Sequence, residues 1–311
     1  MAREKVVLVG VDGSEASLAA VDWAVAEATT LGWRVHIVCA YAVPSFTVAS
    51  LDGGFAAVDD SAIQQGAQTV LDEAVARATA AGVHVTSALE TGDPAGVLVE
   101  LSRQAGIAVV GTRGGGGFTD RLLGTVSSAL PAHAHCPTVV VPQQPDGQPG
   151  YTPVRRMVVG VDGSESAKVA LRRAVDEAIA WNAHLTAVAT VPIGGGVGSL
   201  AWLPAAVDRD EVLADVKEGL SVAVERAVDG RDIVVSQHAL DGNAAALLAE
   251  FSTAVDLVVV GSRGRGGFAG LLLGSTSQAV LHHAACPVLV VPARCADEGT
   301  SPSDVPWRRR P

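Results

Sequence analysis

The chain has 311 residues, 49% of them hydrophobic, and its formal net charge is −11. This length and composition predict a globular protein of about two domains, and the acidic balance argues against nucleic acid as a partner, because nucleic acid selects a basic face. No apolar run approaches the roughly 20 residues that span a bilayer, and the N-terminal sequence has no apolar leader segment, so we expect a cytoplasmic protein without a membrane span.

Valine-rich runs alternate with alanine-rich stretches along the chain. The runs predict ten strands, which lie near residues 5–11, 34–41, 83–89, 107–111, 138–142, 156–161, 184–191, 232–239, 256–261 and 287–291. Helices are expected in most of the gaps, and the first of them begins at Ser14. Apolar strands separated by helices predict an α/β fold, in which each half is an open, doubly wound, parallel five-stranded sheet with helices on both faces.

The second half of the chain repeats the first. After a shift of 150 residues, 18 of the 32 positions in 111–142 are identical to those in 261–292. This period is that of an ordinary domain, so it predicts two similar domains joined by a linker. The expected limits are 1–142 for the first domain, 143–154 for the linker, 155–292 for the second domain and 293–311 for a disordered tail. Segments 43–60 and 192–208 are expected to be mobile loops.

Each half carries the same glycine pattern after its fourth predicted strand. The pattern is G-x-x-G, nine residues, then G-[ST], and it consists of Gly111, Gly114, Gly124 and Thr125 in the first half and of Gly261, Gly264, Gly274 and Ser275 in the second. A helix is expected to begin after the last glycine. Bare backbone and a helix N-terminus then direct N–H groups and the positive end of the helix dipole at an anion, so the pattern predicts a polyphosphate site.

Side chains near the glycines are further candidate ligands. Hydroxyl donors are expected from Thr125, Ser127, Ser275 and Ser277, the intervening residues Val126 and Thr276 complete the cradle, and the candidate cations are Arg113 and Arg263. The repeated turn VGVDGS ends the first strand of each half and carries Asp12 and Asp162, whose carboxylates can accept hydrogen bonds from a ribose or a base. The alternative is that the glycines only form turns and the hydroxyls only cap helices.

The turns and glycine loops resemble those of the universal stress protein family in its tandem, two-domain form, over residues 5–142 and 155–292. The spacing G-x-x-G-x9-G-[ST] is the ATP-binding signature of that family. The resemblance implies the strand order 3-2-1-4-5 in each sheet, and an adenine held by backbone near Tyr41 in the first half and Val191 in the second. It also implies that the last strands of two domains pair. We predict that the two halves pair in this way within one chain and that chains then associate as homodimers.

The function that the resemblance implies is nucleotide-dependent regulation in a stress or dormancy response, with ATP as the ligand, Mg²⁺ as its optional companion and a protein partner not identified by the sequence. One alternative is a slow ATPase or a nucleotide-dependent transferase, although the chain contains neither a P-loop lysine motif nor the kinase signatures. The other alternative is an interaction scaffold with vestigial pockets. We assign no catalytic residue and expect at most weak ATP hydrolysis.

Histidines and cysteines gather near the end of each half, at His133, His135 and Cys136 and at His282, His283 and Cys286. Two histidines and one cysteine without a carboxylate cluster are a poor zinc site, so we expect no metal. The histidines are expected to end a helix, and the four cysteines are expected to be reduced thiols, chiefly in the core. Pro131 is expected to kink or shorten the last helix of the first half.

Overall fold

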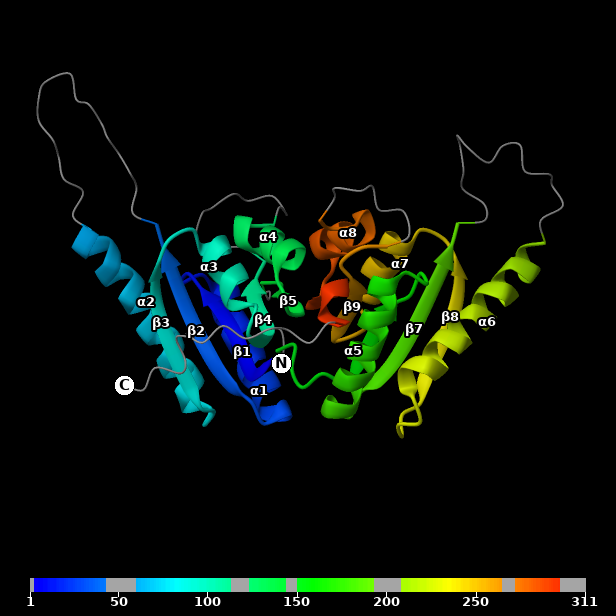
Figure 1. Ribbon diagram of the computed structural model, residues 1–311, viewed down its shortest axis with the longest axis horizontal. Helices are drawn as coiled ribbons and strands as arrows, with labels where there is room; N and C mark the ends of the chain where they lie inside the picture. Colours follow the sequence, from blue (N-terminus) through cyan, green and yellow to red (C-terminus); the bar gives the residue numbers. More distant parts are fainter. Residues whose placement is uncertain are drawn as a thin grey trace, which may run out of the picture.

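The computed structural model describes residues 3–42, 60–112, 123–143, 150–192, 208–264 and 272–296. Most of each predicted mobile loop, at 43–60 and 192–208, lies outside these ranges, as does the predicted tail from residue 297 onward. Within the described residues, strands and α-helices alternate along the chain, in the arrangement that Figure 1 shows.

The strands lie close to the valine-rich runs. They are β1 Glu4–Val11, β2 Arg34–Tyr41, β3 Val85–Thr91, β4 Ala105–Gly111, β5 Thr138–Val141, β6 Arg156–Gly160, β7 His184–Val191, β8 Val235–Asp241, β9 Leu257–Gly261 and β10 Val288–Val291. Every residue of β5 and β10 is buried, as expected for strands that are covered on both faces. The predicted strand limits differ from the observed ones by at most three residues.

The helices fill the gaps between strands. They are α1 Glu15–Leu31, α2 Asp60–Ala80, α3 Pro94–Leu101, α4 Thr125–His133, α5 Glu165–Trp181, α6 Arg209–Val228, α7 Ala244–Phe251 and α8 Ser275–His283. The side chain of Ser14 caps α1 by accepting from the N–H of Ser17 at 3.2 Å, which confirms the predicted start of this helix.

Pro131 lies inside α4, which has nine residues, as does α8 at the equivalent place in the second half. The expectation that this proline shortens the helix is therefore wrong. Because Pro131 stands in the last turn, it removes one helical donor, and the next bond of the turn, from Ala134 N to Leu130 O at 2.8 Å, still forms. The predicted histidine ends are confirmed, since α4 stops at His133 and α8 at His283.

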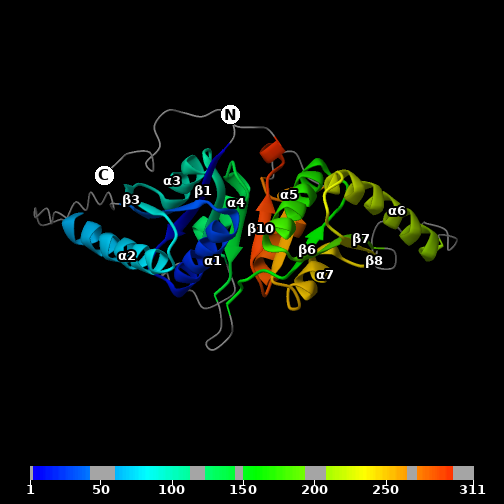
Figure 2. The same ribbon diagram turned by 90° about the horizontal axis from the view of Figure 1, so that it is seen from below.

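All ten strands form one sheet in the order β3-β2-β1-β4-β5-β10-β9-β6-β7-β8. Each half has the order 3-2-1-4-5 with parallel neighbours, as the family resemblance implied. The two halves meet where β5 and β10 pair antiparallel, with Val139 opposite Leu289. Figure 2 shows β10 in the middle of the molecule, between the two halves. The implied pairing of the last strands thus takes place within one chain.

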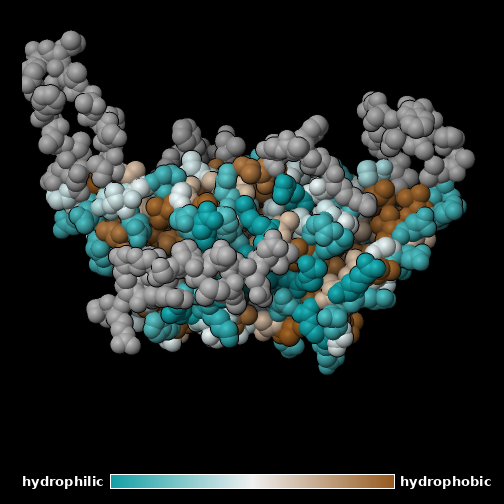
Figure 3. All heavy atoms as spheres, viewed as in Figure 1, coloured by the Kyte–Doolittle hydropathy of each residue, from teal (hydrophilic) through white to brown (hydrophobic). Residues whose placement is uncertain are grey.

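Helices cover both faces of this sheet. One hydrophobic core joins α1, α2, α5 and α6 to one face, and a second core joins α3, α4, α7 and α8 to the other. On the side of the molecule seen in Figure 3, the described surface is mainly hydrophilic, and hydrophobic residues form small, separate groups. In the ranges given above, no helix combines the length and the apolarity needed to cross a membrane.

The chain segment after β10 differs from the prediction of a tail that is disordered from residue 293. Residues Ala293–Ala296 form a short 3-10 helix, η1. Its Cys295 packs against the hydrophobic core beside α5, and Arg294 Nη2 donates to the carbonyl of Ala132 in the first half at 2.9 Å. These contacts explain why the chain stays ordered past the last strand.

Candidate functional site

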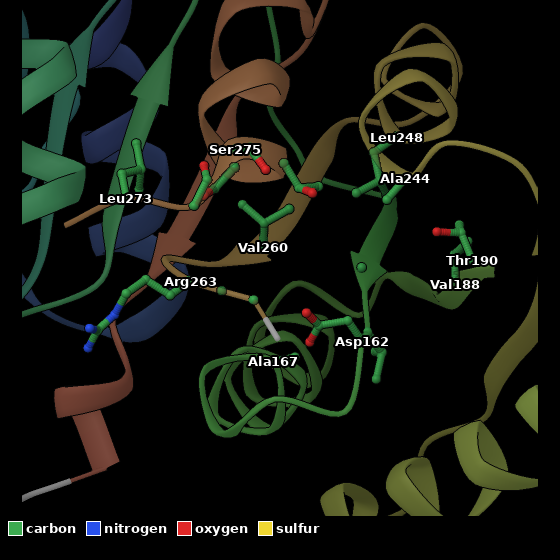
Figure 4. A pocket seen from close by; sticks show the side chains of 17 residues that line it. Asp162, Ala167, Val188, Thr190, Ala244, Leu248, Val260, Arg263, Leu273 and Ser275 are labelled. Carbon is green, nitrogen blue, oxygen red and sulfur yellow. The ribbon is translucent and has the colours of Figure 1, made fainter. Parts of the chain in front are cut away.

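A cavity of about 370 Å³ lies in the second half, at the carboxyl ends of β6 and β9 and at the start of α8 (Figure 4). Open α/β sheets bind ligands at this edge, where the winding of the sheet reverses. Of the nine residues predicted for this half, the cavity is lined by all except Val191, namely by Asp162, Gly261, Arg263, Gly264, Gly274, Ser275, Thr276 and Ser277. The glycine pattern and the VGVDGS turn are therefore brought together by the fold.

The carboxylate of Asp162 stands on the turn that follows β6. Gly163 has φ 80°, in the left-handed region, and this allows the chain to turn sharply into α5. Asp162 Oδ1 accepts a hydrogen bond from Ser164 N at 3.0 Å, and Ser164 caps α5. In the first half, Asp12 Oδ1 accepts from the N–H and the hydroxyl of Ser14. Both aspartates are exposed at the same strand end and so can contact a ligand there.

The three glycines of the pattern have different roles. A Cβ atom on Gly261 would lie 2.4 Å from Ser166 Oγ and 2.8 Å from the Ser166 carbonyl carbon, so this glycine lets α5 pack against β9. A Cβ atom on Gly264 would lie 2.6 Å from Asp162 Oδ2, so the loop backbone passes directly beside the carboxylate. Gly274 approaches the backbone of Arg263 and Gly264. The first glycine thus serves packing, and the other two shape the cavity.

Gly274 is the N-cap residue of helix α8, and no side chain caps the helix. Its first helical hydrogen bond runs from Gln278 N to Gly274 O at 2.9 Å. The N–H groups of Ser275, Thr276 and Ser277 have no acceptor among the residues that the structure describes, and all three residues line the cavity. An uncapped helix N-terminus that opens into a cavity is a ready site for an anion.

The serine hydroxyls contact the backbone, which corrects one prediction. Ser277 Oγ donates to the Ser262 and Gly274 carbonyls, at distances of 3.1 and 2.9 Å. Ser127 Oγ makes the equivalent bond to the Thr112 carbonyl at 2.7 Å. Both side chains are buried. Their single hydroxyl protons are therefore used to fix the ends of the glycine loop, and they are not free donors for a phosphate.

The Arg263 side chain extends away from Asp162 and Val260, toward η1, as Figure 4 shows. Its contribution to the cavity is therefore made by the part near the backbone, and the guanidinium does not face the site as predicted. Arg113 and Gly114 of the first half lie outside the described residues. The remaining predicted residues of the first half, namely Gly111, Gly124, Thr125, Val126 and Ser127, lie at the end of β4 and the start of α4, as their counterparts do at β9 and α8.

Tyr41 and Val191 end the second strand of each half, where the resemblance placed adenine. Their carbonyls accept hydrogen bonds from Gly92 N at 2.9 Å and from Gly242 N at 3.1 Å. Val191 does not line the cavity, whereas Val188 and Thr190 of the same strand do. The wall also includes Leu248 and Val260, which sequence reasoning did not select because their spacing is that of ordinary core residues.

The two halves differ at five positions of this wall. Thr190, Ser275, Thr276, Ala167 and Ala244 in the second half correspond to Ala40, Thr125, Val126, Ser17 and Pro94 in the first. The second half thus has threonine hydroxyls at two wall positions where the first half has apolar side chains.

Comparison with known proteins gives the family of the chain. The sequence model of the universal stress protein family matches residues 4–142 and 153–292. The chain belongs to the universal stress protein family. Among its relatives, universal stress protein Rv1996 of Mycobacterium tuberculosis is 32% identical over 307 residues, a match that covers 91% of this chain and 94% of the relative. Universal stress protein Rv2623 of the same organism is 32% identical over 300 residues, covering 91% and 95%.

A solved structure supports the tandem fold. The crystal structure of a universal stress protein from Archaeoglobus fulgidus aligns with a TM-score of 0.67 and 21% identity, and the alignment covers 93% of this chain and 97% of that one. Both glycine patterns of the present universal stress protein lie within the two matched segments.

The cysteines of this universal stress protein lie apart from the site. Cys39, Cys136 and Cys286 are buried and Cys295 is partly buried, and none forms a disulfide. Burial raises the pKa of Cys136 and of Cys286 to about 12, so both are protonated thiols at neutral pH. The prediction that the cysteines lie chiefly in the core is confirmed for these three buried residues. In the described part of the chain, no group of three potential metal-ligating side chains comes together.

Proposed function

We propose that this universal stress protein binds ATP in the cavity of its second half, and that occupancy of the cavity regulates association of the chain with itself or with a protein partner. The observation that carries the proposal is the juxtaposition, across one cavity, of the Asp162 carboxylate with three N–H groups at the start of α8 that find no acceptor in the described residues. The N–H groups suit a phosphate chain. The carboxylate repels phosphate but accepts hydrogen bonds from ribose hydroxyls, so the two features select opposite ends of a nucleotide.

The size and lining of the cavity fit this ligand. Its volume of about 370 Å³ lies within the roughly 300–1,000 Å³ of typical small-molecule sites. Val188, Leu248 and Val260 give part of the wall an apolar surface against which a base can pack, and Thr190 adds a hydroxyl on the same side of the sheet end.

Binding is favoured over turnover. Among the described residues that line the cavity, only Asp162 and Arg263 have ionisable side chains, and the Arg263 guanidinium extends away. Phosphoryl transfer needs a positioned base and charge neutralisation at the γ-phosphate. The described wall contains one carboxylate and no cation directed at the phosphate site, so we expect hydrolysis to be slow or absent.

The test is a calorimetric titration of nucleotide-free protein with ATP, ADP and AMP. The proposal predicts binding of ATP with at least one site per chain, and a loss of roughly 10- to 100-fold in affinity for Asp162→Ala, the range for removing a hydrogen bond to a charged group. Unchanged affinity in this variant would contradict the assigned role of Asp162. Steady phosphate release that Asp162→Ala abolishes would instead support the slow ATPase.

We also propose that the chain acts in the cytoplasm and that it associates as a homodimer. The β5 and β10 edges pair within the chain, which leaves β3 and β8 as the outer strands of the sheet. A homodimer must therefore use a surface other than the last strands. Sedimentation across micromolar concentrations tests the association, and a monomer throughout, with and without ATP, would contradict it.

A further inference from the structure

Two buried glutamates meet where α1 of the first half contacts α5 of the second. Glu27 is 0% exposed and Glu177 is 1% exposed. They occupy the same position in the duplicated sequence, 150 residues apart. Glutamate is seldom fully buried unless it is paired, so each carboxyl group at this junction needs a partner.

Among the described residues, the junction offers fewer cations than carboxyl groups. Arg173 Nε donates to Glu177 Oε1 at 2.7 Å, and Arg173 Nη2 lies 3.9 Å from Glu27 Oε1. Trp181 Nε1 donates to Glu27 Oε2 at 2.8 Å. The duplication has not preserved the arginine, since the first-half counterpart of Arg173 is Trp23. Two carboxyl groups therefore share one guanidinium.

The charge balance requires one more positive charge. Two carboxylates and one guanidinium sum to a net charge of −1, which is costly to bury. Two carboxyl oxygens, Glu27 Oε1 and Glu177 Oε2, are buried and receive no hydrogen bond from any donor in the described residues. One proton held between the two carboxyl groups makes the cluster neutral and gives these oxygens a partner, as in other close carboxyl pairs.

We propose that the contact between α1 and α5 is a binding site for one proton, shared by Glu27 and Glu177, and that release of this proton weakens the contact between the two halves. The proposal does not depend on nucleotide binding. The site lies on the helices of one face of the sheet, and neither glutamate lines the cavity of the second half.

The surrounding groups favour the protonated state. Burial, followed by the charge of Glu177, raises the pKa of Glu27 well above its usual value, and Arg173 and Trp181 oppose the shift. Other ionisable groups near Arg173 include Asp176 on α5, which forms an ion pair with Arg231, and the thiols of Cys136 and Cys295, whose pKa values are raised by burial. The cations Arg3 and Arg294 lie near these thiols.

The sign of the pH effect follows from the raised pKa. The folded chain retains a proton that the unfolded chain releases near the ordinary glutamate pKa, so the stabilisation is fully present below that pKa. It is lost as the pH rises through the raised value in the folded protein. Alkaline solution leaves the cluster with its net charge of −1 buried, and the α1–α5 contact is then at its weakest.

The experiment compares the full chain with Glu27→Gln over pH 5–9, by thermal unfolding and by the infrared band of a protonated carboxylic acid. Glutamine mimics the protonated side chain, and its amide can donate to Glu177. The parent protein is expected to lose at least about 2–4 °C in Tm toward pH 9 and to show the acid band near neutral pH. Glu27→Gln should remove most of this loss and should remove the band.

Three further variants keep the result unambiguous. Glu177→Gln should also flatten the pH profile, because it too leaves one carboxylate for one guanidinium. The double variant leaves Arg173 without a carboxylate and should be less stable than the parent throughout the range. Glu218→Gln, at an exposed position on α6, is the matched control and should behave as the parent. A parental pH profile and acid band in both single variants would overturn the proposal.

Discussion

Gly264 lies so close to Asp162 that a Cβ atom on the glycine would come within 2.6 Å of the carboxylate oxygen Oδ2. The fourth-strand loop and the first-strand turn, about 100 residues apart in sequence, therefore form one wall of the cavity. This contact explains why a glycine stands at this position of the pattern. It also means that Gly264 can be tested for a role in ligand binding, and Gly261 for a role in packing.

Gly264→Ala is expected to displace the Asp162 carboxylate and to weaken ATP binding, while changing the free energy of unfolding little, because the clash is with an exposed side chain that can move. Calorimetry and urea denaturation measure the two effects. Gly219→Ala is the control, because nothing lies within 4 Å of the added methyl group; it should gain about 0.5–1 kcal/mol as a helix residue. Full ATP affinity in Gly264→Ala would show that the contact has no part in binding.

Gly261→Ala is expected to have the opposite effect, chiefly on the free energy of unfolding. The new methyl group meets the Ser166 carbonyl carbon at 2.8 Å and the Ala167 nitrogen at 3.0 Å, and this backbone cannot move without shifting α5. Overpacking of this kind costs about 1–3 kcal/mol. Urea denaturation should therefore show a lower midpoint, and parental stability would mean that α5 and β9 are less tightly packed than the structure shows.

The reciprocal pair Thr276→Val and Val126→Thr tests the difference between the halves. Threonine and valine are close in shape, so the first exchange removes one hydroxyl group at the second residue of α8 and the second adds one at the second residue of α4. Thr276→Val should weaken ATP binding in the second half by roughly 2- to 10-fold, and Val126→Thr should strengthen it in the first by a similar factor. Stoichiometry and affinity come from calorimetry. Unchanged values in both variants would assign the asymmetry to other residues.

His36 predicts an acid-sensitive first half. The side chain is fully buried on β2, where Nδ1 lies 2.9 Å from Thr86 Oγ1, and burial, aided by Arg34, lowers its pKa to about 4. As the pH falls below 6.5, His36 is protonated in the unfolded chain but stays neutral in the folded chain. The free energy of unfolding is therefore highest above that pH and falls toward pH 4. The loss should reach about 3 kcal/mol.

The check is urea denaturation of the parent protein and of His36→Gln between pH 7 and pH 4. The glutamine variant keeps a polar side chain that does not titrate, so its stability should fall less steeply with acid. If the free energy of unfolding falls equally with acid in the two proteins, residues other than His36 cause the acid sensitivity.

The sequence predicts most of this fold because the strands are buried on both faces. Such strands consist of consecutive apolar residues, and runs such as LVVVG at Leu257–Gly261 mark them directly. The order of the strands in the sheet is harder to predict than their positions. It depends on the direction in which each crossover connection turns, and the periodicity of the sequence does not specify that direction. The order 3-2-1-4-5 therefore came from the family resemblance. The 3-10 helix at Ala293–Ala296 was missed because contacts with the first half stabilise it.

The parts of the candidate site that the backbone forms could be predicted from the sequence. The parts that side chains form could be predicted less well. Glycine spacing located the loop and the start of α8, since these depend on local geometry. The directions of the Ser277 hydroxyl and the Arg263 side chain depend on neighbours distant in sequence. The Glu27–Glu177 pair did leave a signal in the sequence, because an acidic residue is repeated on the mainly apolar face of a predicted helix in both halves.

The most direct test of the proposed ATP site is the nucleotide content of the protein itself. The chain is purified without added nucleotide and denatured, and the released small molecules are identified and counted by chromatography and mass spectrometry, in parallel with Asp162→Ala. We predict adenine nucleotide at one equivalent per chain or more, reduced in the variant. Absence of any nucleotide, together with no heat on adding ATP, would contradict the account and leave the interaction scaffold as the better description.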